Sequence, residues 1–377
     1  MNAVKSVVRM LFVVFAANPC MSAMAQSPEH QPAAVPSIAE YKDAGLDDCR
    51  PYWNQACPSV YAQVDALFMT RQPRFAQQPM VVDDQTGTTL LSTSDLDFNF
   101  EPGLRATVGM RHSGGRALEF SYFGLCQGDA SAFVEAPDGD SYLIFWDNLV
   151  GNAFVDMDWV RVNYSSWLHS FELNLPCCSG CCESDSGKGK GGGEGKGCAD
   201  SCVGAVRSRS FEWFAGMRYL NVGERLDIAT QRTVVTEIEN GSYNLRTTNH
   251  LYGAQLGARL RRSQGSFGWE ATGKAGIFGN DSHQMQSVTD FPGFELPGRT
   301  VSSSRGGVAF VGEVNLSALV RLTDVWNVRT GYNAMWIEGL ALAPDQLDFD
   351  FASTPSGVRN GGGMFLHGVN VGLEARW

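Results

Sequence analysis

The chain has 377 residues, of which 18% are charged, and a formal net charge of -11 at pH 7. The acidic balance argues against a nucleic-acid-binding surface, and no run of apolar residues in the mature chain is long enough for a transmembrane helix. The 42 Gly, 22 Phe, 9 Trp and 10 Tyr are typical of antiparallel barrels. If the chain crosses a membrane, we therefore expect it to cross as a barrel.

The first 25 residues have the order of a secretory signal peptide. Lys5 and Arg9 precede an apolar run from Met10 to Ala17, and Ala23-Met24-Ala25 supplies small residues for cleavage after Ala25. Residues 26–59 are Pro-rich and polar, with no sustained period, and we interpret them as an N-terminal periplasmic segment. Residues 60–377 are left for a barrel exported into the outer membrane of a Gram-negative-type envelope.

Ten segments of this region alternate apolar and polar side chains, which is the period-two pattern of a strand. They are residues 60–69, 104–111, 116–125, 157–175, 210–220, 250–261, 267–278, 308–322, 325–337 and 364–377. In the last segment Val369, Val371 and Leu373 share one face, and the other face holds Asn370 and Glu374. An apolar outside around a polar inside favours an all-β, transmembrane, antiparallel up-and-down β-barrel of about ten strands, within a range of 10–12. The alternative is an edge strand of a soluble sandwich.

The connections between these segments alternate in length. Long stretches follow the first, third, fifth, seventh and ninth segments, at about 70–103, 126–156, 221–249, 279–307 and 338–363. Short turns follow the second, sixth and eighth segments, as expected when all long loops are extracellular. The exception is an insertion at 176–209.

Two irregularities carry further predictions. The apolar parity of the fourth segment changes near Tyr164 to Ser166, which predicts a bulge. The alternating run 225–238, with a turn at Glu239-Asn240-Gly241, predicts either an extra hairpin or strands that extend beyond the membrane.

Cysteines are concentrated in the insertion, which reads CCSGCCESDSGKGKGGGEGKGCADSC from Cys177. In the cytosol this spacing would suggest zinc, but behind a signal peptide disulfides are favoured, so no metal or cofactor is expected. Eight cysteines are expected on the periplasmic side as disulfide candidates: Cys49, Cys57, Cys177, Cys178, Cys181, Cys182, Cys198 and Cys202. Cleavage after Ala25 leaves an odd number, and we predict that Cys126, at the far end of the third segment, is the unpaired thiol.

Several of these segments resemble a known family. FEWFAGMRYLNVGERL from Phe211, LYGAQLGARL from Leu251, FLHGVNVGLEARW from Phe365 and YSSWLHSFELNL from Tyr164 resemble signature segments of the putative beta-barrel porin-7 family, a planctomycete-type group of outer-membrane proteins. The resemblance covers about 61–377 and implies a barrel, an outer-membrane location and a porin label, with no catalytic residue. The first strand lacks the Trp pair of that family, and the insertion is a second departure.

The polar parity defines candidate lumen-lining residues. These are Arg105, Glu119, Glu212, Arg218, Arg259, Glu270, Lys274, Glu313, Arg321, Arg329, Glu374 and Arg376, joined by Arg111, Arg161, Glu172 and Arg261. Ten strands enclose a narrow lumen, so we expect these charges to pair, with a modest excess of Arg. The predicted function is passive passage of small solutes through this charged lumen, with low conductance and a weak preference for anions.

Two other classes of function stay open. One is a non-conducting structural or adhesin-like barrel, with acidic loops such as Asp138-Gly139-Asp140 and 345–350 that bind something outside. The other is an outer-membrane hydrolase that uses His250, His283 or His367 with Asp83, Asp84 or Asp281. We predict that the protein is not an enzyme. The expected partners are outer-membrane lipids and the assembly machinery, which would read the last strand and its terminal Trp377, and the oligomeric state is not predicted.

Overall fold

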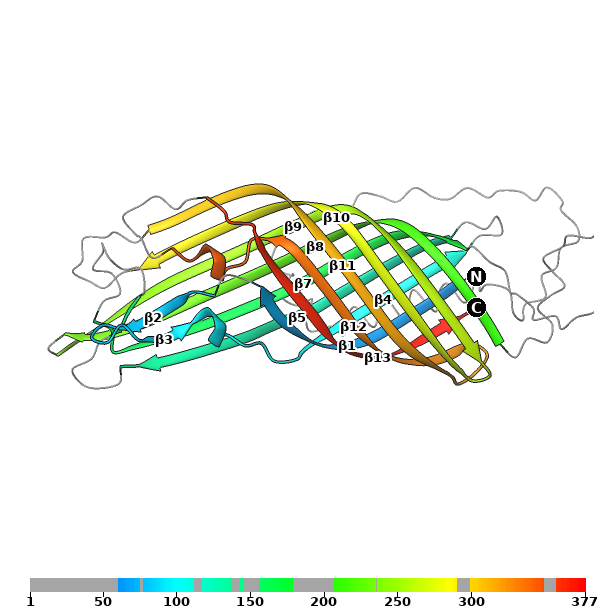
Figure 1. Cartoon of the computed structure of the whole chain (residues 1–377), viewed down its shortest axis with the longest axis horizontal. Helices are drawn as coiled ribbons and strands as arrows, with labels where there is room; N and C mark the ends of the chain where they lie inside the picture. The colour runs from blue at the N-terminus through cyan, green and yellow to red at the C-terminus, as the bar shows by residue number, and fades with distance from the viewer. Residues whose placement is uncertain are drawn as a thin grey trace, which may run out of the picture.

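The strands of the chain close into one barrel. The computed structural model describes residues 60–74, 77–111, 117–136, 143–145, 156–178, 207–234, 236–289, 299–348 and 357–377. In this part of the chain the closed barrel has the order β1-β13-β12-β11-β10-β9-β8-β7-β5-β4. Its strands are β1 (Val60–Arg74), β4 (Glu101–Arg111), β5 (Ala117–Glu135), β7 (Trp159–Cys178), β8 (Arg207–Val234), β9 (Glu237–Gln264), β10 (Phe267–Thr289), β11 (Arg299–Arg321), β12 (Trp326–Leu340) and β13 (Gly362–Arg376). The predicted all-β, ten-stranded antiparallel barrel is confirmed (Figure 1). The signal peptide, the segment 26–59 and most of the insertion lie outside the described residues.

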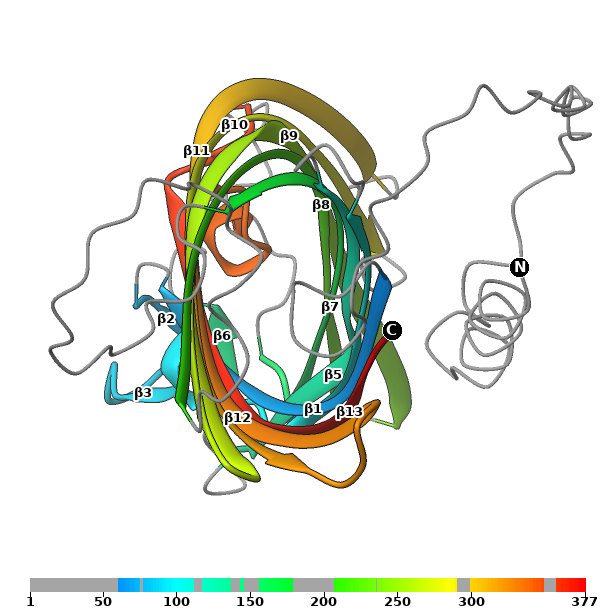
Figure 2. The same ribbon diagram turned by 90° about the vertical axis from the view of Figure 1, so that its right-hand side faces the viewer.

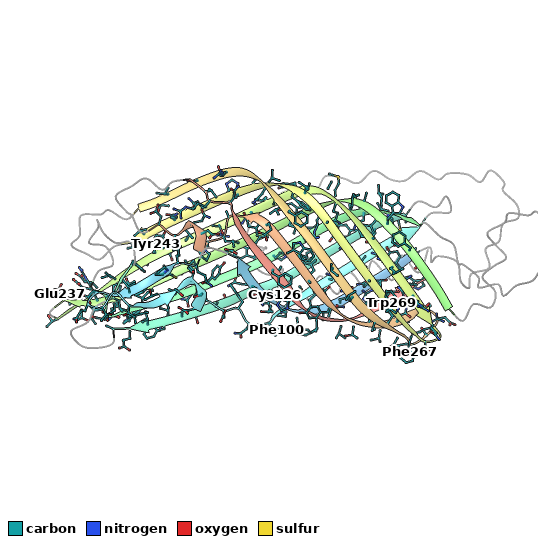
Figure 3. All side chains as sticks on the ribbon, viewed as in Figure 1. Phe100, Cys126, Glu237, Tyr243, Phe267 and Trp269 are labelled. Atoms are coloured by element: carbon teal, nitrogen blue, oxygen red, sulfur yellow. The ribbon has the colours of Figure 1, made fainter. Side chains whose placement is uncertain are left out.

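Each strand pairs with its neighbours in antiparallel register, and β1 closes the ring between β13 and β4. Both ends of the barrel chain and the short turns lie at one end, which we call the turn end. The turn between β9 and β10 is built on Gly265, whose φ of 60° favours glycine. We call the opposite end the loop end, and Figure 3 marks Glu237 at this end and Phe267 and Trp269 at the turn end. Among the described residues, no helix has the length and apolar character needed to cross a membrane.

The strands differ greatly in length around the ring. β8 and β9 have 28 residues each, whereas β1, β12 and β13 have 15. The long strands therefore rise beyond the short ones at the loop end (Figure 1). Arg232 pairs with Glu239, so the residues predicted to turn at 239–241 are part of β9 and the strands extend beyond the membrane.

The long strands exchange their apolar and polar faces partway along. On β8, Trp213 and Met217 face outward and are exposed, but further along Leu226 and Ile228 face inward and are fully buried. Lipid surrounds the first part of the strand and water surrounds the second, so the apolar side chains change sides. The outward positions of Trp213 and Trp269 agree with the predicted lipid face.

The same exchange explains the parity change in the fourth predicted segment. β7 pairs with β8 in continuous register from Trp159 to Cys178, so the predicted bulge near Tyr164 to Ser166 is wrong. The irregularity lies in the partner strand β5, between Leu125 and Gly128. The apolar residues of β7 change sides because the strand leaves the membrane, and its backbone parity stays constant.

Cys126 lies at this irregularity of β5, and Figure 3 marks it well inside the strand. It is disulfide-bonded, so the prediction that Cys126 is the unpaired thiol is wrong. The prediction assumed that Cys126 ends its strand, whereas β5 continues to Glu135. Of the eight disulfide candidates, Cys177 and Cys178 end β7, and the other six lie outside the described residues.

The mouth of the barrel at the loop end is filled by parts of the predicted loops. The strands β2 (Pro79–Asp83), β3 (Thr89–Ser92) and β6 (Leu143–Phe145) form a separate sheet in the order β3-β2-β6, which we call the mouth sheet, and the short helix η2 (Thr93–Asp95) follows β3. A second short helix, η3 (Pro344–Gln346), follows β12, and the chain around it lies inside the ring in the end-on view of Figure 2. Met80, Val81 and Phe145 pack with Val160 and Ile228 of the wall into one apolar cluster.

The outward parity can be tested on β11. Val314 faces outward at the middle of the apolar band, whereas Val308 is its last outward apolar residue toward the loop end. Val314→Arg should lower the free energy of unfolding in lipid vesicles by about 2–4 kcal/mol, and Val308→Arg by about 0–1 kcal/mol. Denaturant titration followed by Trp fluorescence measures both values. Equal losses would contradict the assigned membrane depth.

Candidate functional site: the barrel interior

The turn-end half of the interior is a layer of ion pairs. The described residues place seven cations of the wall in it: Arg105, Arg218, Arg259, Arg261, Lys274, Arg329 and Arg376. They face seven carboxylates: Asp65, Glu119, Glu172, Glu212, Glu270, Glu313 and Glu374. The formal charge of this layer is therefore balanced.

Arg329 of β12 is the centre of the part nearest the turn end. Its guanidinium lies 3.3 Å from Asp65, 3.4 Å from Glu270 and 3.3 Å from Glu374, and its side chain is 2% exposed. Arg261 of β9 also reaches Glu374, at 2.9 Å. Arg329 thus joins β12 to β1, β10 and β13, and Arg261 joins β9 to β13, four places away in the ring. The charges therefore extend into the lumen as well as neutralise each other.

A second group of charges lies further from the turn end than the group around Arg329. Glu313 of β11 accepts a hydrogen bond from Arg105 at 2.8 Å and one from Arg218 at 2.9 Å. Lys274 of β10 lies 3.0 Å from Glu172 of β7. Arg259 of β9 lies 2.8 Å from Glu119 of β5 and 3.0 Å from Glu212 of β8. In each of these pairs the two partners lie on different strands, which the backbone register holds in place.

Two of the predicted arginines lie outside this layer. Arg321 is exposed at the turn end of β11, and Arg161 is exposed on the outer face of β7, where it stacks over Trp159. The side chains that the structure describes in this layer therefore show no excess of Arg, and the side chain of Arg111 is outside them. Arg161 was assigned inward because the apolar residues around it had already changed sides.

Beyond the ion-pair layer, a cluster of apolar side chains fills much of the interior. The cluster consists of Leu67, Met69, Phe123, Leu125, Leu168, Leu220, Val222, Leu251, Phe278, Ala309, Val311, Met335, Ile337, Leu340, Leu342, Met364 and Leu366. None of these side chains is more than 2% exposed. A polar interior was expected along the whole strand, so this layer corrects that expectation. Dry apolar contacts exclude hydrated ions, because an ion loses its hydration without gaining a partner.

A buried ion pair lies close to the apolar layers. Arg71 of β1 and Glu224 of β8 form a salt bridge across the lumen, and neither side chain is more than 1% exposed. Arg71 also donates to the Tyr164 hydroxyl at 2.7 Å and stacks over the ring of Phe98. Neither charge was among the predicted lumen residues, because Arg71 and Glu224 fell in stretches assigned to extracellular loops.

Glu224 also fixes a backbone segment inside the barrel. We call residues 340–347 the inner segment, and its Ala343 N–H donates to Glu224 Oε2 at 2.7 Å. Asn249 of β9 donates to the Ala341 carbonyl at 2.9 Å and accepts from the Ala341 N–H at 2.8 Å. The wall thus supplies partners for a peptide that crosses the lumen, where free backbone groups would be costly.

The predicted histidines and carboxylates lie on the outer wall and in or beside the mouth sheet. His250, His283 and His367 lie on outward positions of β9, β10 and β13. Asp83 lies in the mouth sheet and accepts from Thr86. Three of the predicted residues come together on the outer wall: His283 lies 3.3 Å from Asp281, and His250 pairs with Asp281 across the strands. No serine hydroxyl bonds to His283 in the described chain. No group of three or more metal-binding side chains gathers among the described residues.

The ion-pair layer predicts a strong effect of Arg329. Arg329→Met should destabilise the protein by about 3–5 kcal/mol, because Asp65, Glu270 and Glu374 lose a buried partner. The matched control is Arg321→Met, an exposed arginine whose loss should change stability by less than about 0.5 kcal/mol. Denaturant unfolding in lipid vesicles gives both values. Similar losses in the two variants would contradict the buried network.

The inner segment predicts a local effect of Asn249. Asn249→Ala leaves the buried N–H and carbonyl of Ala341 without this partner, at a cost of about 1–3 kcal/mol for each group. Hydrogen exchange of the Ala341 amide should accelerate. Asn163→Ala, on the exposed outer face of β7, should leave that amide unchanged. Unchanged exchange in Asn249→Ala would argue against the clamp.

The sequence and the fold were compared with known proteins. Residues 59–377 match the sequence model of a family described as Putative beta barrel porin-7 (BBP7). A comparison with curated protein sequences gives no significant match.

Solved outer-membrane barrels are similar at low identity. The outer membrane protease OmpT from Escherichia coli is 10% identical, with a TM-score of 0.42, over 84% of this chain and 96% of that one. A FadL homologue of Pseudomonas aeruginosa is 7% identical, with a TM-score of 0.23, over 85% and 90%. An anion-selective porin from Comamonas acidovorans is 11% identical, with a TM-score of 0.14, over 84% and 98%. Similarity at this level carries no argument about activity.

Proposed function

Because the chain belongs to the putative beta barrel porin-7 family, whose members are outer-membrane barrels, we propose that it is a porin-like barrel with a closed resting state. Passive passage of small solutes then runs at a low level through the narrow charged lumen. The balanced charges of the ion-pair layer give little preference for either sign of ion. We propose no catalytic role.

The observation that carries this proposal is the filling of the interior by three successive layers. Ion pairs fill the turn end, the apolar cluster around Phe278 and Met335 follows, and the mouth sheet occupies the loop end. Ten strands fall between the eight of side-chain-filled barrels and the sixteen of open porins. A barrel of this size is therefore small enough for its own residues to close.

Passage requires the mouth sheet to move, because its strands are separate from the barrel wall. It also requires side chains of the other two layers to shift, since those layers come from the wall strands and the inner segment. The contacts of the mouth sheet with the wall are mainly apolar, around Val81 and Val160. In addition, Leu143 exchanges backbone hydrogen bonds with Met157, just before β7, and Gln78 donates to the Pro344 carbonyl of the inner segment at 2.9 Å.

A second candidate function is a non-conducting structural or surface-binding barrel. The two apolar clusters, one in the middle of the barrel and one under the mouth sheet, favour this function if the mouth sheet stays in place.

Planar-bilayer recordings distinguish the two functions. The unmodified protein should conduct far less than a general porin. A variant in which residues 79–95 are replaced by a Gly-Ser linker should conduct measurably more, because one of the three barriers is lost and only side chains of the wall and the inner segment still fill the lumen. The same linker inserted beside the exposed Glu237, at the loop end of β9, is the matched control and should not conduct more. Circular dichroism verifies that each variant keeps its barrel.

Silence of both the unmodified protein and the 79–95 variant, in folded form, would reject the porin-like proposal and favour the structural barrel. Large steady currents from the unmodified protein would reject the closed resting state.

The finer predictions about origin and assembly are also proposals. We propose a planctomycete-type source, export by the signal peptide and recognition of β13 by the assembly machinery. In support of the last, Trp377 exchanges backbone hydrogen bonds with Val60, of 2.9 and 3.2 Å, so the final residue lies at the seam where the barrel closes. A signal at this position stays accessible to the assembly machinery until β13 pairs with β1 and closes the barrel.

A further inference from the structure

The outer wall over β9, β10 and β11 changes character where the apolar band ends. Tyr252 of β9 and Ile277 of β10 are its last large outward apolar residues, at 59% and 69% exposure. The next outward residue on β9 is His250. On β10, Gly279 follows Ile277, and the outward residue after it is Asp281, which pairs with His250 across the strands. Tyrosines at such an edge mark the interface between membrane and water.

Rings line this edge in continuous contact. The Tyr219 ring lies 4.9 Å from Tyr252 and 6.2 Å from His250, and His250 lies 6.3 Å from His283. The Tyr219 hydroxyl is also 2.9 Å from His250 Nδ1. Amphipathic rings arranged in this way lie at the depth of lipid headgroups.

A hollow of about 350 Å³ opens just beyond the rings. Small residues of β11 lie opposite larger residues of β10: Ser302 is opposite Met285, and Ser304 is opposite His283. The outward residues that line the hollow are Arg246, Thr248, His283, Met285, Ser302 and Ser304. They offer a guanidinium, an imidazole and hydroxyl groups beside one apolar side chain.

Arg246 is held at the hollow by a ring on another strand. Trp167 of β7 lies across Gly223 of β8 so closely that a Cβ at Gly223 would be 2.0 Å from the indole. The indole therefore reaches past β8, and the Arg246 guanidinium stacks over it at 5.6 Å. Stacking fixes the cation without neutralising it.

The charge of Arg246 is left uncompensated. Among the described residues, no carboxylate lies within ion-pair distance of it. Its direct cross-strand neighbour is Arg225, a like charge that opposes it. Arg225 itself pairs with Asp227, at 2.7 Å, and His283 with Asp281. An anion in the hollow would relieve the repulsion between the two arginines.

Hydroxyl groups of the neighbouring strands add to this cation. Thr248, Ser302 and Ser304 line the hollow from the same outer face of the wall as Arg246. The hollow thus combines an unpaired cation with hydroxyl donors, which together match a phosphate group.

We propose that this hollow binds the phosphate-bearing headgroup of an anionic membrane lipid, with Arg246 as the main phosphate contact. The depth of the site points to a lipid rather than a free solute, because the apolar band that begins at Ile277 and Tyr252 gives the acyl chains a surface directly below the headgroup. The proposal is independent of whether the lumen conducts.

Native mass spectrometry of the folded full-length mature barrel, released from detergent with added lipid, tests the site. Phosphatidylglycerol is the anionic probe and phosphatidylcholine the zwitterionic one. The first phosphatidylglycerol should bind at least about tenfold more tightly to the unmodified protein than to Arg246→Gln, as expected for the loss of one charge-assisted hydrogen bond.

Arg161→Gln is the matched control, because Arg161 is also an exposed arginine that stacks over a tryptophan on the outer wall but does not line the hollow. It should bind phosphatidylglycerol like the unmodified protein. Equal binding of the two lipids, or equal losses in both variants, would overturn the proposal. Tighter binding of inorganic phosphate than of phosphatidylglycerol would overturn the assignment to a lipid.

Discussion

The long strands must satisfy two solvents, because each passes from lipid into water without interruption. In lipid the apolar side chains have to face outward, whereas beyond the membrane the same arrangement would expose them to water. β8 meets both demands with Met217 outside and Ile228 inside. The rest of the architecture depends on this exchange. Inward apolar residues in the outer half need something to pack against, and the mouth sheet supplies it.

The membrane-embedded half has the opposite problem. Its apolar residues face the lipid, so polar residues are left to fill the lumen. Its inward face is polar, and ten strands leave too little room for bulk water around separate charges. Charges in such a space are stable only when each has a partner. The contacts of Arg329 with three carboxylates from different strands show how register provides those partners. The ion-pair layer and the apolar layers thus fill the lumen by different means.

The sequence predicts the orientation of side chains wherever a strand stays in one medium, either lipid or water. The outward residues of β11, such as Val314, and the inward charges, such as Glu313, follow directly from period two. The closure of the lumen could not be predicted in this way. Alternation reports which side of a strand is apolar, but it does not report the medium on that side. The change of sides in β7 was therefore interpreted as a bulge, and Arg161 was placed inside. Met80 and Ala341 lie in stretches whose length alone suggested extracellular loops.

Closure is built into the stability of the fold. Glu224 neutralises Arg71 and at the same time accepts the N–H of Ala343, so the ion pair and the inner segment depend on one carboxylate. Removing the inner segment from the lumen would leave that carboxylate with one partner fewer and would free the amide of Asn249. These are buried groups, for which the loss of a partner is expensive. The mouth sheet is held mainly by apolar contacts, which re-form without directional constraint. An open state therefore costs least when the mouth sheet moves and the inner segment stays with the wall.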